Sequence, residues 1–332
     1  MPKSIKVPKE KGESVRAKLA DLGLLDTGYR ISSDGTYLTI PVLCDRFEDY
    51  EVSEVSAEPL EEKISDYKVI LDFPDWLNEE LPRSYDVIGD VAVIKLTEVL
   101  LPYKERIGEA LLEAVPSLRV VMADSGVKGE FRVRDLEKIA GTGTSETVHK
   151  EFGVRIFTDP SKVYFNPRLA GERHRVASLV NDGETVIDMF AGVAPFPLTI
   201  CRLAHPGKVY AIDLNPETER FMKKNIEINH ADIVPIIGDA RKEVKKLPKA
   251  DCIIMNLPQT SEEFLTDALG AAGTGATIHL YKVLERSDFE TFSENLLKKA
   301  EDSGYDMHIA RAQELKTYSP TMAVYAFDLV KD

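Results

Sequence analysis

An acidic residue stands between an apolar run and a turn of small residues in the segment VIDMFAGVAPF, residues 186–196. A new apolar helical pattern follows, so the segment indicates a strand, a tight loop and the N-terminus of a helix. In doubly wound folds this arrangement cradles a nucleotide-like cofactor, because glycine has no Cβ and lets the backbone approach a ligand. The loop residues that we predict to bind a cofactor are Asp188, Phe190, Ala191, Gly192 and Val193.

Polar residues also close the next three apolar runs. Asp213 follows residues 209–212, where an acid suits the two hydroxyls of a ribose, and Asp239 and Asn256 close the later runs. Four such strand ends favour an S-adenosylmethionine methyltransferase over a dehydrogenase, which more often carries a complete GxGxxG and no Asn-x-Pro. The further cofactor contacts predicted there are Asp213, Leu214, Asp239, Ala240 and Asn256.

The composition is that of an ordinary globular protein. The chain has 332 residues, 43% of them hydrophobic and 30% charged, which is enough for two or three domains. It contains no apolar run near the roughly 20 residues that span a bilayer, and no secretion signal at its start. We therefore expect no membrane association and a cytoplasmic location. Its three cysteines and six histidines lack metal-ligand spacing, so we expect free thiols and no metal site.

The charge is unevenly distributed. A formal net charge of −14 argues mildly against a nucleic-acid partner. Residues 128–175 nevertheless hold ten Lys and Arg against seven Asp and Glu, and residues 3–21 hold six against three. These two segments are possible phosphate-facing surfaces, although each is equally compatible with an ordinary solvated face.

The order of patterns predicts an α/β chain of three domains. Residues 1–65 are expected to form a small α/β domain that ends in an acidic linker, with a hairpin turn at residues 32–35. Residues 66–165 are expected to form a middle α+β domain. Residues 166–332 alternate strands and helices and close with two strands, as in a Rossmann-like class I S-adenosylmethionine methyltransferase domain.

Five motifs together resemble the archaeal and eukaryotic tRNA (guanine-N1-)-methyltransferases, over nearly the whole chain. They are GEFRVR at 129–134, VYFNPRLAGER at 163–173, DMFAGV at 188–193, IDLNP at 212–216 and NLP at 256–258. The resemblance implies the three-domain archaeal form, S-adenosylmethionine as cofactor, and methylation of the guanosine at tRNA position 37, just 3′ of the anticodon. It also implies that the domain of residues 1–65 recognises tRNA by inspecting its elbow and that the middle domain of residues 66–165 binds RNA. We expect a monomer that needs no obligate protein partner.

The resemblance also implies roles for particular residues. Glu172 is the expected general base, Arg132 supports O6 of the guanine, and Asn256 holds the guanine edge. This assignment is chemically sensible, because guanine N1 is a poor nucleophile until its proton leaves and charge moves to O6. The further substrate contacts that we predict are Arg134, Tyr164, Arg168, Arg173 and Pro258, with Tyr164 stacking on a base turned out of its stack.

Three other functions remain open at this point. A relative in wyosine biosynthesis would methylate or aminocarboxypropylate a modified guanosine at the same position. An RNA-binding module without turnover would bind cofactor and make no product. A protein-amide methyltransferase would typically show Asn-Pro-Pro-Tyr, which this chain lacks. One departure from the family concerns Ala194, which stands where relatives carry glycine and is harmless unless that position needs a positive φ.

Overall fold

The computed structural model describes residues 2–59, 66–129, 131 and 133–332. These residues fall into two compact units, Met1–Val69 and Ile70–Asp332, which we describe separately. No helix within the described ranges is long and apolar enough to cross a membrane.

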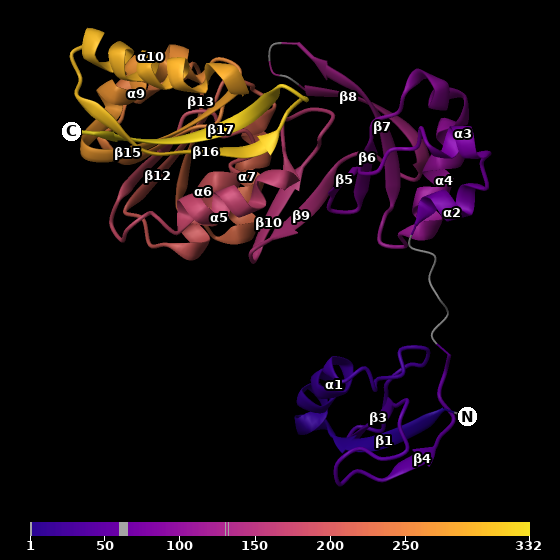
Figure 1. The fold of residues 1–332 in the computed structure, drawn as a ribbon. Coiled ribbons are helices and arrows are strands. Elements are labelled where there is room, and N and C mark those ends of the chain that lie inside the picture. Colours follow the sequence, from indigo (N-terminus) through magenta and orange to yellow (C-terminus); the bar gives the residue numbers. More distant parts are fainter. Residues whose placement is uncertain (1, 60–65, 130, 132) are drawn as a thin grey trace. The chain divides into compact units, whose positions relative to one another are not determined.

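The first unit is a small sheet covered by one helix (Figure 1). Its four strands lie in the order β2-β3-β1-β4, with β1 antiparallel to both of its neighbours. The elements are β1 (Lys3–Pro8), η1 (Lys9–Lys11), α1 (Gly12–Asp21), β2 (Ser32–Ser33), β3 (Tyr37–Pro41) and β4 (Val52–Glu54). Ile5, Leu19 and Ile40 are completely buried between helix and sheet. The hairpin predicted at residues 32–35 is confirmed, and Asp34 closes its turn by accepting the N–H groups of Thr36 and Tyr37.

The second unit begins with a sheet in the order β5-β6-β7-β8, flanked by helices. Its elements are α2 (Tyr67–Leu71), which crosses the division between the units, α3 (Asp75–Asn78), β5 (Asp86–Ile88), β6 (Val91–Ile94), η2 (Glu98–Tyr103), α4 (Lys104–Ala114), β7 (Val120–Lys128) and β8 (Val133–Gly141). Helix α4 packs on β7 and β8 because Ile107 and Leu111 lie on one face, where both are fully buried. A separate hairpin, β9 (Thr147–Glu151) and β10 (Val154–Thr158), then leads to the large sheet.

The large sheet has seven strands in the order β13-β12-β11-β14-β15-β17-β16. The first five strands are parallel, and β17 runs antiparallel between β15 and β16. The strands are β11 (Thr185–Asp188), β12 (Lys208–Asp213), β13 (Ile233–Ile237), β14 (Ala250–Met255), β15 (Ala272–Glu285), β16 (Met307–Thr317) and β17 (Met322–Lys331).

Helices cover both faces of this sheet, as Figure 1 shows, and each layer has its own hydrophobic core. The helical elements are η3 (Pro167–Leu169), α5 (Ala170–Ala177), α6 (Pro195–Leu203), α7 (Thr218–Asn229), α8 (Ala240–Glu243), η4 (Val244–Lys246), η5 (Ser261–Phe264), α9 (Leu265–Ala271), η6 (Arg286–Asp288) and α10 (Phe289–Asp302). The predicted fold class is confirmed. The domain boundary near residue 165 stays a prediction, because both later domains lie within the second compact unit.

The strand order creates a crevice at one edge of the sheet. Strand β11 lies between β12 and β14. The connection after β11 therefore runs toward β12, and the connection after β14 runs toward β15, on the opposite side. Ligands of open α/β sheets bind at such a switch point. The residues predicted to bind cofactor follow these same strand ends.

Candidate active site

The loop after β11 is tightly wound around two residues with positive φ. Gly192 has a φ of 56° and Ala194 a φ of 64°. A Cβ added at Gly192 would lie 3.2 Å from the carbonyl oxygen of Tyr164, so glycine is needed there for space as well as conformation. Ala194 caps α6 in the left-handed conformation that side chains disfavour. The alanine at position 194, where relatives carry glycine, therefore stands at a position with a positive φ.

Asp188 ends β11 with a carboxylate that is only half satisfied. Its Oδ1 accepts the N–H of Phe190 at 3.1 Å, whereas its buried Oδ2 has no partner among the described residues. Burial raises the pKa of Asp188 to about 8. A buried carboxylate with an unused oxygen can accept a cation or a hydrogen-bond donor from a ligand.

Asp213 ends the neighbouring strand β12 and is held by the loop itself. Its Oδ2 accepts the N–H of Gly192 at 2.7 Å, and its Oδ1 accepts the N–H of Asn215 at 2.9 Å. Burial raises the pKa of Asp213. Each carboxylate oxygen has a second lone pair, so the side chain can still accept two hydroxyls.

A small cavity opens where these loops meet. Six of the predicted site residues line it, namely Tyr164, Arg173, Phe190, Ala191, Gly192 and Asn256. The ring of Phe190 also meets Phe264 edge-on at 4.9 Å. No hydrogen bond from the Asn256 side chain is formed with the described part of the chain, so its amide is free for a ligand. The structure thus brings together residues from three separated segments.

Other predicted cofactor residues lie at the same edge but outside the cavity wall. Asp239 caps α8 by accepting the N–H of Arg241 at 3.0 Å, and Ala240 behind it is buried. Leu214 is 49% exposed. The Val193 side chain is completely buried in the core, so only its backbone faces the loop.

Glu172 lies in α5 and is almost buried. Its carboxylate accepts Nε and Nη2 of Arg175, at 2.9 Å and 2.7 Å, and the hydroxyl of Tyr281 at 2.9 Å. Glu172 is absent from the cavity wall, but the ring of Tyr281 packs on Phe196, which lines the cavity, with ring centres 5.8 Å apart. Glu172 therefore does not line the cavity itself, and the side chains of Tyr281 and Phe196 connect it to the cavity wall.

Two predicted substrate-binding arginines share one carboxylate. Arg134 and Arg168 donate to opposite oxygens of Asp86 at 2.7 Å and 2.6 Å. Burial alone would raise the pKa of Asp86, but the hydrogen bonds from both arginines lower it. Lys316 from β16 is nearby, and its pKa is lowered by burial and by the charges of Arg168 and Arg134. The cluster of Arg134, Arg168, Lys316 and Asp86 therefore carries more positive than negative groups.

Arg173 lines the cavity and is also bound tightly to the protein. Its guanidinium is 1% exposed, donates to both oxygens of Glu151 at 2.6 Å and to the carbonyl oxygen of Asn166 at 3.1 Å, and lies over the ring of Phe165. These bonds hold the start of α5 against β9. They use three of the five N–H groups of the guanidinium, so the predicted substrate contact stays a prediction.

Two further predictions concern the ends of the site. Arg132 lies outside the described residues. Pro258 follows β14, is half-buried, and its carbonyl oxygen accepts the N–H of Val283 at 2.8 Å. This bond ties the Asn-Leu-Pro turn to β15.

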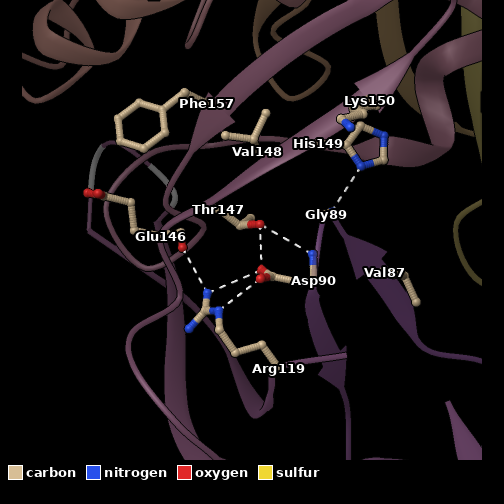
Figure 2. Close-up of a pocket in the computed structure, with 10 residues that line it drawn as sticks. All are labelled: Val87, Gly89, Asp90, Arg119, Glu146, Thr147, Val148, His149, Lys150 and Phe157. Carbon is tan, nitrogen blue, oxygen red and sulfur yellow. Dashed lines mark hydrogen bonds and ion pairs between the residues drawn. The ribbon is translucent and has the colours of Figure 1, made fainter. Parts of the chain in front are cut away.

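A larger hollow lies elsewhere in the second unit, between β5 and the β9–β10 hairpin (Figure 2). It has a volume of about 690 Å³, and none of the predicted site residues lines it. Asp90 in its wall accepts two bonds from Arg119 and one from Thr147, so these polar groups satisfy one another. The hollow offers no arrangement for chemistry. Within the described ranges no group of His, Cys, Asp and Glu could hold a metal ion.

The residues that surround Glu172 were not predicted from the sequence. Arg175 also donates to Asp328 of β17, and Asp328 contacts His279 of β15. Only Arg175 carried a readable signal, because it stands one helical turn after Glu172. Asp328 and His279 are brought together by strand pairing between β15 and β17.

Three family models match successive parts of the chain. Residues 4–51 match the tRNA methyltransferase 5 N-terminal domain, residues 68–144 the TYW2 N-terminal domain, and residues 147–308 the TRM5/TYW2 methyltransferase domain.

Known proteins are similar over the whole length. The chain is 38% identical to the tRNA (guanine(37)-N(1))-methyltransferase Trm5b of Pyrococcus abyssi, over 99% of this chain and 98% of that protein. The crystal structure of that Trm5b matches with a TM-score of 0.76 at 36% identity, over 100% of both chains. The structure of a complex of aTrm5 and tRNALeu matches with a TM-score of 0.72 at 33% identity, also over 100% of both chains.

A relative with another activity is similar over a shorter span. The tRNA(Phe) (4-demethylwyosine(37)-C(7)) aminocarboxypropyltransferase of Pyrococcus horikoshii is 32% identical over 78% of this chain and 92% of that protein. The seven-stranded sheet, the polar strand ends and the full-length similarity lead to one conclusion. The chain belongs to the Trm5 family of tRNA (guanine(37)-N(1))-methyltransferases.

Proposed function

We propose that this chain transfers a methyl group from S-adenosylmethionine to N1 of the guanosine at tRNA position 37. One observation carries the proposal: a chain similar over its full length to Trm5b places two acids and a free asparagine at the switch point of its methyltransferase sheet. The substrate is tRNA, and we expect the chain to act on it as a monomer in the cytoplasm, without an obligate protein partner.

The residues at the sheet edge fit the cofactor. The unpaired Oδ2 of Asp188 suits the positively charged end of S-adenosylmethionine, and the two oxygens of Asp213 suit its ribose hydroxyls. The lack of a Cβ at Gly192 lets the loop pass close to the backbone of Tyr164 in the cavity wall. When bound, the cofactor supplies a methyl group already activated on a sulfonium, so the protein has to position the guanine and manage its proton.

Glu172 is the proposed acceptor of the N1 proton. The bidentate bond from Arg175 holds the carboxylate in one orientation. Because guanine N1 cannot attack while it carries its proton, an ionised and fixed carboxylate is the group that the reaction requires. Since Glu172 lies behind Phe196 and Tyr281, a guanine that reaches it must enter the cavity deeply or shift these rings.

Asn256 and Tyr164 are the proposed contacts with the guanine. Both line the cavity, and the Tyr164 ring is 40% exposed, so a base turned out of its stack can lie on it. The amide of Asn256 offers an acceptor and two donors in one plane, which matches a guanine edge. Arg132 is the proposed partner of O6, where negative charge appears as the proton leaves.

Arg134 and Arg168 are proposed to meet tRNA phosphates near the target base. Asp86 holds both side chains in place and leaves Arg168 half-exposed. Fixed guanidinium groups with spare donors suit phosphate oxygens. This local cluster explains how an acidic chain can bind an acidic polymer. We propose that Arg173 chiefly holds α5, on the evidence of its bonds to Glu151.

The alternative is an activity of the wyosine pathway at the same tRNA position. The match of residues 68–144 to the TYW2 N-terminal domain and the similarity to an aminocarboxypropyltransferase favour it. The match of residues 4–51 to the tRNA methyltransferase 5 N-terminal domain, together with full coverage of Trm5b, favours guanine methylation.

The test is methyl transfer to an unmodified tRNA transcript with guanosine at position 37, beside a transcript with adenosine there. Nucleoside mass analysis of the products should find 1-methylguanosine from the first transcript alone. A mass increase larger than a methyl group would support aminocarboxypropyl transfer. No product from either transcript, with product from tRNA that already carries the tricyclic base, would overturn the proposal in favour of the wyosine alternative.

A further inference from the structure

Glu172 is the first member of a largely buried chain of charged groups that links α5 to β17. Arg175 contacts Glu172 through Nε and Nη2, and contacts Asp328 through Nη1 and Nη2 at 2.8 Å and 3.0 Å. One guanidinium is therefore divided between two carboxylates. The side chains of Glu172 and Asp328 are 6% and 8% exposed, so solvent screens neither of them.

Asp328 is held by more than Arg175. Nδ1 of His279 lies 2.7 Å from its Oδ1, and a guanidinium nitrogen of Arg311 lies 3.7 Å from its Oδ2. Burial alone would raise the pKa of Asp328, but the hydrogen bonds from His279 and Arg175 lower it to about 2. Asp328 is therefore ionised at every pH at which an enzyme assay is practical.

Tyr281 contacts the same oxygen of Glu172 as Nη2 of Arg175. Its hydroxyl donates to Oε1 of Glu172, and its ring is 1% exposed. Burial and the neighbouring Glu172 raise the pKa of Tyr281, so it remains a neutral donor. A neutral donor stabilises the charged form of a carboxylate.

The titratable and charged groups around Glu172 come from several elements of the second unit. Glu172 itself is contacted by Arg175 on α5 and Tyr281 on β15. Asp328 on β17, which shares Arg175, is contacted by His279 on β15, lies near Arg311 on β16 and interacts electrostatically with Cys252 on β14. Cys252 stays a neutral thiol, because burial raises its pKa. The charge that Glu172 meets is thus set by Arg175, which Asp328 partly neutralises.

These contacts have opposite consequences for a base. A carboxylate that faces an unshared guanidinium is strongly ionised and accepts a proton poorly. Asp328 weakens the hold of Arg175 on Glu172 and repels its charge, which makes Glu172 a stronger base. Tyr281 has the reverse effect, because its hydrogen bond is strongest to the ionised form.

We propose that Asp328 and Tyr281 are positioning residues that set, by opposing effects, how readily Glu172 takes the N1 proton of the substrate. The inference rests on the function proposed above. In the step concerned, the N1–H bond of guanine breaks, the proton passes to a carboxylate oxygen of Glu172, and the electron pair stays on N1. Neither Asp328 nor Tyr281 touches the substrate.

The test is the pH dependence of single-turnover methyl transfer, which isolates the chemical step from product release. The variants Tyr281→Phe and Asp328→Asn each keep the shape of the side chain. In Tyr281→Phe the acid limb of the profile should move up by about 0.5 pH unit. In Asp328→Asn it should move down by about one pH unit, and the plateau rate should fall about tenfold because the base is weaker.

A matched control removes a carboxylate on the same sheet that does not contact Glu172. Glu314 of β16 pairs with Arg286, and Glu314→Gln should leave the acid limb in place. Limbs of Tyr281→Phe and Asp328→Asn that move in the same direction, or not at all, would overturn the inference. Equal shifts in all three variants would also overturn it, since they would reflect a general charge effect.

Thermal unfolding and S-adenosylmethionine binding of each variant separate a folding defect from altered chemistry. If Asp328→Asn does not fold, Tyr281→Phe decides the question alone, because an unshifted limb there contradicts the inference. A wild-type chain that makes no 1-methylguanosine would overturn the proposed function and this inference with it. A wild-type profile that the variants leave unchanged would overturn the inference only.

Discussion

The carboxylates of Asp188 and Glu172 are both buried, yet their environments are opposite. Asp188 has one bond from the backbone, an oxygen without a partner among the described residues, and a pKa raised to about 8 by burial. Glu172 accepts three bonds, two of them from a guanidinium. Among the described residues the first carboxylate has no counterion, whereas the second shares the guanidinium of Arg175 with Asp328.

This difference distinguishes a binding group from a chemical group. A carboxylate without a counterion gains most when a cationic ligand arrives, because the ligand supplies the missing charge. A carboxylate that is already ionised and oriented gains nothing from the ligand, but it is ready to accept a proton. We therefore propose that the residues at the strand ends bind the cofactor and that Glu172 in the α5 cluster takes part in the proton transfer.

Removal of the proposed base should have the largest effect on the rate. Glu172→Gln keeps the volume of the side chain and should lower the single-turnover rate about 100- to 10,000-fold at neutral pH. Binding of S-adenosylmethionine and tRNA should stay within about threefold, because the chemical step alone loses its proton acceptor. Rapid-quench assays and filter binding measure the two quantities. A rate equal to wild type would show that Glu172 is not the base.

Arg173 tests whether the fully paired region is also structural. Arg173→Lys loses the bidentate bond to Glu151 and should lower the free energy of unfolding by about 3 kcal/mol. Chemical denaturation measures the loss. Arg168→Lys is a matched control, because Arg168 is half-exposed and should contribute less than about 1 kcal/mol. Unchanged stability of Arg173→Lys, with weaker tRNA binding, would return Arg173 to the substrate contacts.

Asp188 tests the region that lacks a counterion. With a pKa of about 8 it is mostly protonated at pH 7, and a bound cation should drive the proton off. Binding of S-adenosylmethionine should therefore release up to one proton at pH 7 and progressively fewer as the pH rises past 8. Calorimetry in buffers of different ionisation enthalpy measures this release.

The matched variants for Asp188 separate proton release from affinity. Asp188→Asn should abolish the release and weaken binding about 10- to 100-fold. Asp239→Asn removes a carboxylate at the next strand end, where Asp239 caps α8, and should keep the release. Release that persists in Asp188→Asn would contradict the assignment. Because burial raises this pKa above its unfolded value of about 3.9, the ligand-free protein should also lose stability as the pH rises toward 8.

Ala194 gives the smallest expected effect. It holds a φ of 64°, which glycine adopts without strain, so Ala194→Gly should stabilise the ligand-free protein by about 1 kcal/mol. Calorimetry should show this as a rise of about 2–4 °C in Tm. Thr199→Ser, in the same helix, should give no comparable rise. A lower Tm for Ala194→Gly would mean that the alanine methyl contributes more through packing than its conformation costs.

The sequence predicted the sheet edge better than the α5 cluster, for a physical reason. Asp188, Asp213 and Asn256 each follow an apolar run, and parallel strands bring their carboxyl ends to one edge. Asp328, which contacts Arg175, meets His279 only through the register of β15 and β17, in which the two residues pair. No local pattern encodes that meeting.

Burial explains the remaining difference. Glu172 and Arg173 are neighbours in one motif, and nothing in the sequence says which of them faces the protein interior and which faces a substrate. In α5 consecutive side chains point in different directions, so Glu172 meets Tyr281 while Arg173 meets Glu151. Likewise, sharing of Asp86 by Arg134 and Arg168 depends on the contact of η3 with the β5–β8 sheet.

The most direct test of the central claim is the single-turnover rate of Glu172→Gln and wild type from pH 6.5 to 9. If Glu172 takes the N1 proton, the variant must rely on loss of that proton to solvent, so its rate should rise roughly tenfold per pH unit. The wild-type rate should rise much less, and the gap between the two should close as the pH increases. A constant ratio of the two rates across this range would contradict the account, because it would mean that Glu172 acts on something other than the proton.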